Sequence, residues 1–378
     1  MASSPIKNRA LWLSSFTEPL SIVELPVPSA DAGTVVVQIL AAGLAPYTHL
    51  IHSGKIPGLN LTPPLVPNPS GIGRVHAVGP DAVRLKAGDL VFIDGLVRGR
   101  DDPDICLMPG HMTGGHPKAQ KLMQGVWRDG SLQQYQKVPL ETCFVLDEER
   151  LIGELGYDPA ILHTLSHYSV AAGALLEAAD VKVAETVIIG PSGGSFGGLA
   201  VEVALAAGAN VIALGRSETK LKVMREKLNN SRLSTVAMTG DVEVDAAAIM
   251  DATPGKAGAE VFNDWTPGEL QTPPYLSAAA LALKKDGRIV LSGGAGGNLQ
   301  LPYGLCLLRN LKLVGKWMCE RRTVDQVIRM VTQGQLKIGK ESGSEIKLFG
   351  LEEHEEAVEH ARKYGGWRNY TAILPNRN

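Results

Sequence analysis

The strongest constraint on the fold of this chain is the stretch of residues 186–216, TVIIGPSGGSFGGLAVEVALAAGANVIALGR. Its β-branched beginning is typical of a buried parallel strand, and the five glycines of residues 190–198 allow a sharp turn without Cβ clashes. Apolar and small residues then recur at helical spacing as far as residue 207, and residues 211–214 form a second apolar run. The stretch therefore predicts a strand–helix–strand crossover, which needs about 30 residues.

The glycine loop of this crossover is a candidate phosphate-binding site. A pyrophosphate would lie at the helix N-terminus, where unpaired N–H groups and the helix dipole attract anions. The glycines follow the pattern G-x-x-G-G-x-x-G-G rather than G-x-G-x-x-G, but the flanking strands and helix stand in the order that a dinucleotide site requires. A second glycine cluster occupies residues 293–297. The residues expected to contact the dinucleotide are Ser192, Gly193, Gly194, Ser195, Phe196, Gly197, Gly293 and Gly294.

The end of the second strand distinguishes an NAD site from an NADP site. An NAD site places Asp or Glu near this point to hold the ribose 2′-hydroxyl. In its place this chain has Gly215, Arg216, Ser217 and, shortly after them, Lys220. A guanidinium, a hydroxyl and an ammonium would hold a 2′-phosphate, so the sequence favours NADPH/NADP+ as the cofactor. The alternative interpretation is that Arg216 is a solvated loop charge.

The length and composition of the chain limit the classes of partner. A chain of 378 residues suggests two domains. With 44% hydrophobic residues, 20% charged residues and a net charge of −2, it has no basic footprint for nucleic acid, so we expect a small-molecule substrate. No apolar run reaches the roughly 18 residues of a membrane span and the N-terminus lacks a signal-peptide core, so we expect no membrane partner and a cytoplasmic location. The four cysteines stand far apart without C-x-x-C, which argues against disulfides or a cysteine zinc cluster.

Secondary-structure patterns change along the chain near residue 157. Short apolar strands between Pro and Gly positions predict a compact, largely antiparallel β-rich domain over the first 150 residues. Helical patterns then alternate with buried strands, which predicts a doubly wound α/β domain. The C-terminal segment has the pattern of the first domain, and we expect it to return and complete that domain, leaving a cleft between the two. The expected strands are 21–25, 34–42, 73–78, 89–93, 186–189, 211–214, 288–291, 313–317, 346–349 and 370–374, and the expected helices are 159–165, 170–178, 199–207, 324–332 and 351–364.

Three further segments resemble the medium-chain dehydrogenase/reductase family. They read VVVQILAAGLAPYTHLIHSGK, PPLVPNPSGIGRVHAVGPDAVRLKAGDLVF and GSLQQYQKVPLETCFVLDE, and the likeness extends from about residue 20 to residue 374. The resemblance implies an α/β fold in which a GroES-like, β-rich catalytic domain (residues 1–155 and 318–378) accompanies a Rossmann domain with a doubly wound parallel sheet (residues 156–317). It also implies hydride transfer involving a nicotinamide ring.

The chain departs from the zinc-dependent alcohol dehydrogenases of that family at their metal ligands. Ala45 and Pro46 stand where those enzymes carry a Cys-His pair, and Asn68, Pro69 and Ser70 replace their G-H-E motif. None of these positions keeps a family ligand.

Two other features concern the metal. The third ligand position falls at or near His167, and one imidazole cannot make a three-ligand zinc site by itself. The lobe that holds a structural zinc through four cysteines has only Cys106. We therefore predict no zinc of either kind, and the chain resembles the zinc-independent branch that includes quinone oxidoreductases and enoyl reductases.

Without a metal, a hydrogen-bond donor must stabilise the negative charge that develops on the substrate oxygen. Tyr47 occupies the position of a Ser or Thr hydroxyl in the zinc enzymes, and His167 is its main rival as a donor; His49 and the nearby His52 could also exchange protons. The structural alternatives are a packed pocket wall for Tyr47 and hydrogen-bonded or solvated histidines. Related enoyl reductases use a G-x-Y tyrosine where this chain reads Gly54-Lys55-Ile56, which disfavours an enoyl-thioester reductase of that type.

Apolar side chains beyond these residues suggest a pocket and an assembly. Trp127, Tyr303, Leu305 and Leu308 could line an apolar pocket, although core or dimer packing would explain them equally well. Residues 299–302 and 311–317 are two apolar strand candidates in the region through which relatives join their sheets edge to edge. An exposed edge invites pairing, so we expect a homodimer.

These observations predict a zinc-independent, NADPH-dependent oxidoreductase acting on a carbonyl, or on an alkene conjugated to one, in a small organic substrate. Two alternatives remain open. One is an NADP-dependent dehydrogenase of secondary alcohols, and the other is a protein that binds NADPH without turnover, as a sensor.

Overall fold

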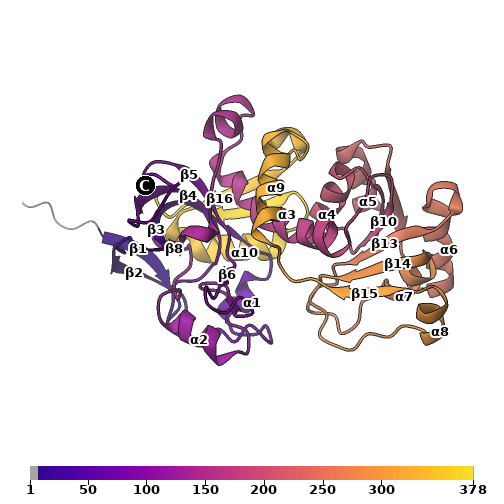
Figure 1. Ribbon diagram of the computed structural model, residues 1–378, viewed down its shortest axis with the longest axis horizontal. Coiled ribbons are helices and arrows are strands. Elements are labelled where there is room, and N and C mark those ends of the chain that lie inside the picture. Colours follow the sequence, from indigo (N-terminus) through magenta and orange to yellow (C-terminus); the bar gives the residue numbers. More distant parts are fainter. Residues whose placement is uncertain (1–6, 378) are drawn as a thin grey trace, which may run out of the picture.

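The computed structural model describes residues 7–377. The first six residues, part of the segment in which we expect no signal peptide, lie outside them. Two sheets of different construction lie side by side along the long axis of the molecule, one built mainly from the first third of the chain and one from its middle (Figure 1). No helix among residues 7–377 is long and apolar enough to cross a membrane.

The first sheet is centred on the long strand β3 (Thr34–Leu44) and is largely antiparallel, as expected. Its order is β16-β17-β3-β4-β5-β9, and β8 also pairs with β3. The C-terminal strand β17 pairs antiparallel with β3 and parallel with β16, so the end of the chain returns to the sheet of its beginning. The other strands are β4 (Gly71–Val78), β5 (Leu90–Ile93), β8 (Tyr135–Pro139), β9 (Cys143–Val145), β16 (Glu345–Phe349) and β17 (Asn369–Ile373).

The second sheet has six parallel strands in the order β12-β11-β10-β13-β14-β15. Because the direction of winding reverses between β10 and β13, a crevice for ligands is expected outside the carboxyl ends of these two strands. This confirms the predicted doubly wound Rossmann sheet. The strands are β10 (Thr186–Gly190), β11 (Asn210–Gly215), β12 (Leu233–Ala237), β13 (Ala259–Asp264), β14 (Leu283–Leu291) and β15 (Lys312–Gly315).

Helices cover both faces of the parallel sheet, which explains why its strands read as continuous apolar runs. Along β10, Val187 and Ile189 pack in the core shared with α3, α4 and α5, whereas Ile188 packs in the core shared with α6 and α7. The alternation follows from the two-residue period of a strand. The helices of this part of the chain are α3 (Leu165–Ala172), α4 (Ser195–Ala206), α5 (Glu218–Leu228), α6 (Val242–Ala252), α7 (Leu276–Leu281) and α8 (Tyr303–Leu308). Helix α9 (Arg321–Thr332) packs on α3, and α10 (His354–Tyr364) packs on β17 of the first sheet.

One of the expected elements is wrong. No strand forms at residues 299–302; the chain there leads into the short helix α8, and only β15 extends the sheet. Pro302 stands directly before α8, a place that suits proline because the first N–H groups of a helix have no intrahelical partner.

Three helices also differ in detail from their expected form. The one expected at 159–165 is the 3₁₀ helix Pro159–Thr164. The helix expected at 351–364 begins with a 3₁₀ turn before α10, and the one expected at 170–178 is formed by the end of α3 and a wider turn from Gly173.

Candidate functional site

The glycine loop lies at the carboxyl end of β10, beside the crevice of the parallel sheet. Helix α4 begins after Gly194, so the N–H groups of its first turn point to the loop without intrahelical partners. A Cβ on Gly197 would lie 2.0 Å from the carbonyl oxygen of Pro191, so only glycine fits this turn. Gly193 and Gly194 are exposed with open space around them. The loop can therefore receive an anion from the solvent side.

The side chains of the loop have different surroundings. Ser192 is buried and its hydroxyl donates to the carbonyl oxygen of Leu214 at 2.9 Å, so it holds the loop to β11. Ser195 and Phe196 are half-buried in the first turn of α4. The ring of Phe196 stacks on Trp265, with 5.7 Å between centroids and an interplanar angle of 10°.

The second glycine cluster adjoins the same crevice. The N–H group of Gly294 donates to the carbonyl oxygen of Thr266 at 2.7 Å, and a Cβ on Gly293 would lie 2.4 Å from that oxygen. Asp264, at the end of β13, accepts the Thr266 hydroxyl at 2.6 Å, and burial raises the pKa of its carboxyl. The loop after β14 is thus held against the loop after β13, on the side of the sheet where the glycine loop lies.

Arg216 directly follows Gly215, the last residue of β11, and is exposed. It forms no ion pair among residues 7–377. Ser217 caps helix α5, and its hydroxyl accepts the N–H of Lys220 at 3.3 Å. The structure therefore places Arg216, Ser217 and Lys220 together at the N-terminus of α5, where an anion is favoured.

His167, in α3, is a predicted catalytic residue that contacts the first turn of α4. Its ring contacts Phe196, with 4.9 Å between centroids, and its Nδ1 lies 3.3 Å from the Ser166 hydroxyl. Burial, with a further contribution from His163, lowers the pKa of His167 to about 3. The ring is therefore neutral near pH 7 and can offer one N–H as a donor.

His163 is a candidate that the sequence reasoning missed. It is buried, its Nδ1 pairs with the carbonyl oxygen of Ala160 at 2.7 Å, and burial lowers its pKa to about 4. Its ring lies 6.2 Å from that of His167 and 5.8 Å from that of Tyr370. A Cβ on Gly43, near the end of β3, would lie 1.8 Å from its Cδ2. This contact joins the 3₁₀ helix Pro159–Thr164, which precedes α3, to β3, and it could not be read from sequence spacing.

Tyr47 and His49 lie at helix α1 (Thr48–His52), which follows β3. Tyr47 packs in an apolar cluster that includes Trp127, and burial raises the pKa of its phenol to about 12. Its hydroxyl has no hydrogen bond among residues 7–377. The Nδ1 of His49 lies 3.2 Å from the carbonyl oxygen of Pro46. In the part of the chain that the structure describes, no hydrogen bond or ring contact joins either residue to His167.

His52, at the end of α1, is poorly suited to proton exchange near neutral pH. Burial first, and then the neighbouring His111, His354 and His49, lower its pKa to about 4. It therefore stays neutral at pH 7.

The side chains at the family's metal positions do not fit zinc. Ala45, Pro46 and Pro69 have no ligating atom, and the hydroxyl of Ser70 donates to the carbonyl oxygen of Ile93 at 2.7 Å. Within residues 7–377, no three His, Cys, Asp or Glu side chains come together as a metal site would require. Zinc independence stays a prediction that rests on this set of side chains.

The four residues suggested as a pocket lining fall into separate groups. Trp127 packs with Tyr47, and Leu305 packs against the core of the parallel sheet. Tyr303 and Leu308 are 82% and 79% exposed on α8. Packing in a dimer therefore explains these two side chains better than a pocket lining does.

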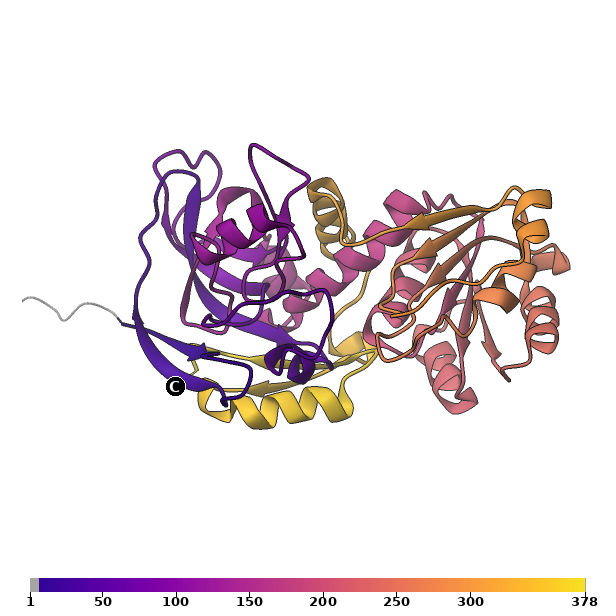
Figure 2. The same cartoon turned by 90° about the horizontal axis from the view of Figure 1, so that it is seen from below.

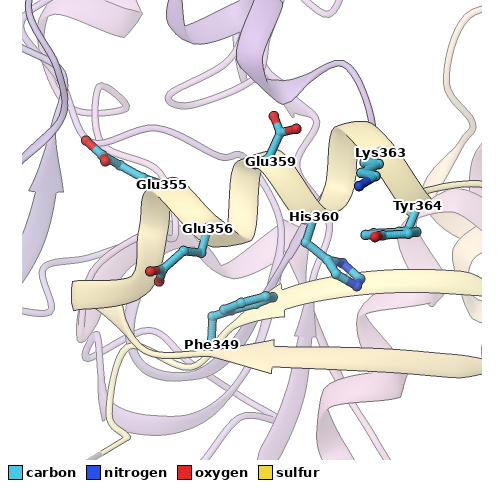
Figure 3. A pocket seen from close by; sticks show the side chains of 7 residues that line it. All are labelled: Phe349, Glu355, Glu356, Glu359, His360, Lys363 and Tyr364. Atoms are coloured by element: carbon cyan, nitrogen blue, oxygen red, sulfur yellow. The ribbon is translucent and has the colours of Figure 1, made fainter.

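A hollow of about 530 Å³ lies on the outer side of α10, lined by Phe349, Glu355, Glu356, Glu359, His360, Lys363 and Tyr364 (Figure 3). None of the predicted site residues lines it. The ammonium of Lys363 lies over the Tyr364 ring, and that of Lys347 lies over the Phe349 ring. Two of its aromatic rings therefore already hold a cation, and we do not assign the hollow to the site.

Two family models match complementary parts of the chain. Residues 31–148 match the alcohol dehydrogenase GroES-like domain, and residues 196–333 match the zinc-binding dehydrogenase model. An NAD-dependent alcohol dehydrogenase of Sulfolobus acidocaldarius is 26% identical over 361 residues, which cover 94% of this chain and 96% of the relative. An alcohol dehydrogenase of Geobacillus stearothermophilus is 24% identical over 331 residues, which cover 87% of this chain and 90% of the relative.

Solved structures agree on the fold. A structure from Sinorhizobium meliloti, described as a zinc-binding dehydrogenase bound to NADP, superimposes with a TM-score of 0.76 at 18% identity and covers 98% of this chain and 100% of its own. The two family models, the relatives that match nearly end to end and the paired GroES-like and Rossmann sheets lead to one conclusion: this chain belongs to the medium-chain dehydrogenase/reductase family, whose members are oxidoreductases that bind a nicotinamide cofactor.

Proposed function

We propose that this protein is an NADPH-dependent oxidoreductase that works without zinc and reduces a carbonyl, or an alkene conjugated to one, in a small organic substrate. When it is bound, the nicotinamide supplies the hydride. The observation that carries the proposal is Arg216, an exposed guanidinium free of ion pairs among the described residues at the end of β11. An NAD site would place a carboxylate there.

The surroundings of Arg216 support the choice of NADPH over NADH. A guanidinium can bind a 2′-phosphate through two parallel N–H groups, and the N-terminus of α5 adds a favourable dipole. Lys220 adds a second positive charge in the same turn. The relatives do not decide the matter, because the Sulfolobus enzyme is named NAD-dependent and the Sinorhizobium structure is bound to NADP.

Two neutral side chains are the proposed donors to the developing oxyanion. The phenol of Tyr47 stays protonated because its pKa is raised by burial, and the imidazole of His167 stays neutral because its pKa is lowered. Each can donate one hydrogen bond without a metal. His167 is the better placed for the nicotinamide end, since its ring contacts Phe196 beside the glycine loop. His49 is a proposed relay at the surface of α1.

A second candidate function is the oxidation of a secondary alcohol with NADP+. The observation in its favour is that the relatives that match nearly the whole chain are named alcohol dehydrogenases. This oxidation is the reverse of the carbonyl reduction, and the side chain that donates to the oxygen in the reduction would accept the alcohol's proton in the oxidation.

We also propose that the protein is a homodimer joined through the edge of the parallel sheet. Strand β15 is the last strand of that sheet, and its residue Leu313 is 50% exposed. Leu307, Leu308 and Trp317 are exposed large apolar residues of the same segment. An edge strand with apolar side chains favours pairing with a second copy.

The test is a pair of measurements on the purified protein. Reduction of a panel of ketones and enones is followed with NADPH and with NADH, before and after prolonged treatment with a zinc chelator. We expect higher kcat/KM with NADPH and the same activity after chelation. Activity that chelation abolishes and zinc restores would overturn the zinc-free assignment. Turnover only in the oxidative direction, on secondary alcohols with NADP+, would favour the second candidate.

A further inference from the structure

A buried carboxylate lies in the middle of helix α4, where the proposed reaction does not use it. Glu202 is 5% exposed, and its two oxygens accept four hydrogen bonds from three residues in two other segments. Trp367 donates its Nε1–H at 2.7 Å, Arg368 donates Nε–H at 3.1 Å and Nη2–H at 3.0 Å, and Tyr168 donates its hydroxyl at 3.0 Å. Glu202 thus ties α3 and the chain before β17 to the helix that follows the glycine loop.

Arg368, the charged partner of Glu202, is held in an unfavourable conformation. It is 4% exposed and has a φ of +59°, a left-handed conformation that non-glycine residues rarely adopt. Such a conformation persists where its surroundings enforce it, and such residues cluster at functional sites. The pair with Glu202 compensates a charge that would otherwise be costly to bury. Glu202 therefore fixes the path of the chain through residues 365–368.

Residues 365–368 lie beside the glycine loop. The Trp367 ring lies on the first turn of α4, where a Cβ on Gly198 would come within 2.2 Å of its Cδ1. A Cβ on Gly366 would lie 3.6 Å from the carbonyl oxygen of Gly193. The segment then continues into β17, which pairs with β3 in the other sheet. In Figure 2 the yellow C-terminal part lies along the first sheet, and one of its ends reaches the part of the molecule that holds the parallel sheet.

We propose that Glu202 is a positioning residue that holds residues 365–368 against the glycine loop, and that pyrophosphate binding depends on this contact. The inference rests on the proposed dinucleotide site but not on the choice between NADPH and NADH, because both carry the pyrophosphate. Glu202 has no part in hydride transfer itself.

The first test is Glu202→Gln, which keeps the shape of the side chain and removes its charge. We expect the Kd of both NADPH and NADH to rise about tenfold, since small misplacements of a binding element have effects of at least this size. Binding of 2′-AMP, which has no pyrophosphate, should stay unchanged; adenosine replaces it as the probe if NADH proves to be the preferred cofactor. The matched control is Glu185→Gln, which breaks the partly buried pair with Arg288 at the opposite end of β10.

A second variant guards against loss of folding in the first. Trp367→Ala removes the ring from Gly198 and leaves the Glu202–Arg368 pair in place, and we expect the same selective loss of dinucleotide affinity. Unchanged dinucleotide Kd in the folded variants, or an equal loss for the probe without pyrophosphate, would overturn the inference. A wild-type protein that binds neither NADPH nor NADH would instead overturn the proposed function, so the two failures are distinguishable.

Discussion

At the scale of the residue, the choice of cofactor rests on Arg216. Replacing it with alanine removes hydrogen bonds to a charged phosphate, each worth about 1.5–3 kcal/mol. We expect Arg216→Ala to raise the KM for NADPH by roughly 10- to 100-fold and to leave the KM for NADH nearly unchanged. Steady-state kinetics with both cofactors measures this. Arg225→Ala, near the C-terminus of α5, is the control, and an equal effect of the two substitutions would contradict the assignment.

Also at this scale, buried histidines make the stability depend on pH. Burial lowers the pKa of His163 to about 4. Burial and the neighbouring His163 lower the pKa of His167 to about 3. In the unfolded chain both histidines have a pKa of about 6.5. Between these values the unfolded chain binds more protons, so the free energy of unfolding falls as the pH drops below about 6.5, by up to about 1.4 kcal/mol per pH unit for each histidine. Urea unfolding at pH 7 and pH 5 measures the difference. The difference in the free energy of unfolding between the two pH values should be smaller in His167→Gln. It should be unchanged in His76→Gln, because His76 is exposed.

At the scale of the element, the turn from β10 into α4 separates two roles of glycine. A Cβ on Gly197 meets the backbone of Pro191, so Gly197→Ala should displace the loop and lower the free energy of unfolding by about 1–3 kcal/mol. A Cβ on Gly194 would have no atom of the protein within 4 Å, so the Gly194→Ala variant should fold normally. If the pyrophosphate occupies the loop, Gly194→Ala should nevertheless weaken cofactor binding. Thermal unfolding and cofactor titration of both variants test this, and full affinity in Gly194→Ala would place the pyrophosphate elsewhere.

At the scale of the whole molecule, the exposed edge of β15 predicts assembly. We expect the wild-type protein to have the mass of a dimer in solution and Leu313→Glu to shift it toward the monomer, because a buried carboxylate would face its own copy across a two-fold axis. Light scattering after gel filtration measures the mass. Val83→Glu, a change at a fully exposed position of the other part of the chain, should leave it unchanged. A monomeric wild-type protein would refute the proposed dimer.

The elements could be predicted where one local pattern determines them. The buried runs of β10 and β11, and the helix after the glycines, follow from apolar periodicity and turn chemistry over a few residues. The strand expected at residues 299–302 was wrong because apolar character alone does not separate a strand from a loop that leads into a helix. Arg216 and Ser217 could be placed because they follow directly from a predicted strand.

The sequence by itself determined the two sheets and the position of the glycine loop, because each depends on contiguous segments with their own periodicity. The family followed from the resemblance of further segments to its members. Only the tertiary structure brought His163 against Gly43, His167 against Phe196, and Glu202 against Arg368. His167 and Phe196 are 29 positions apart in the chain, and Glu202 and Arg368 are 166 positions apart. Contacts of this kind arise from the packing of one element on another, which no local pattern encodes.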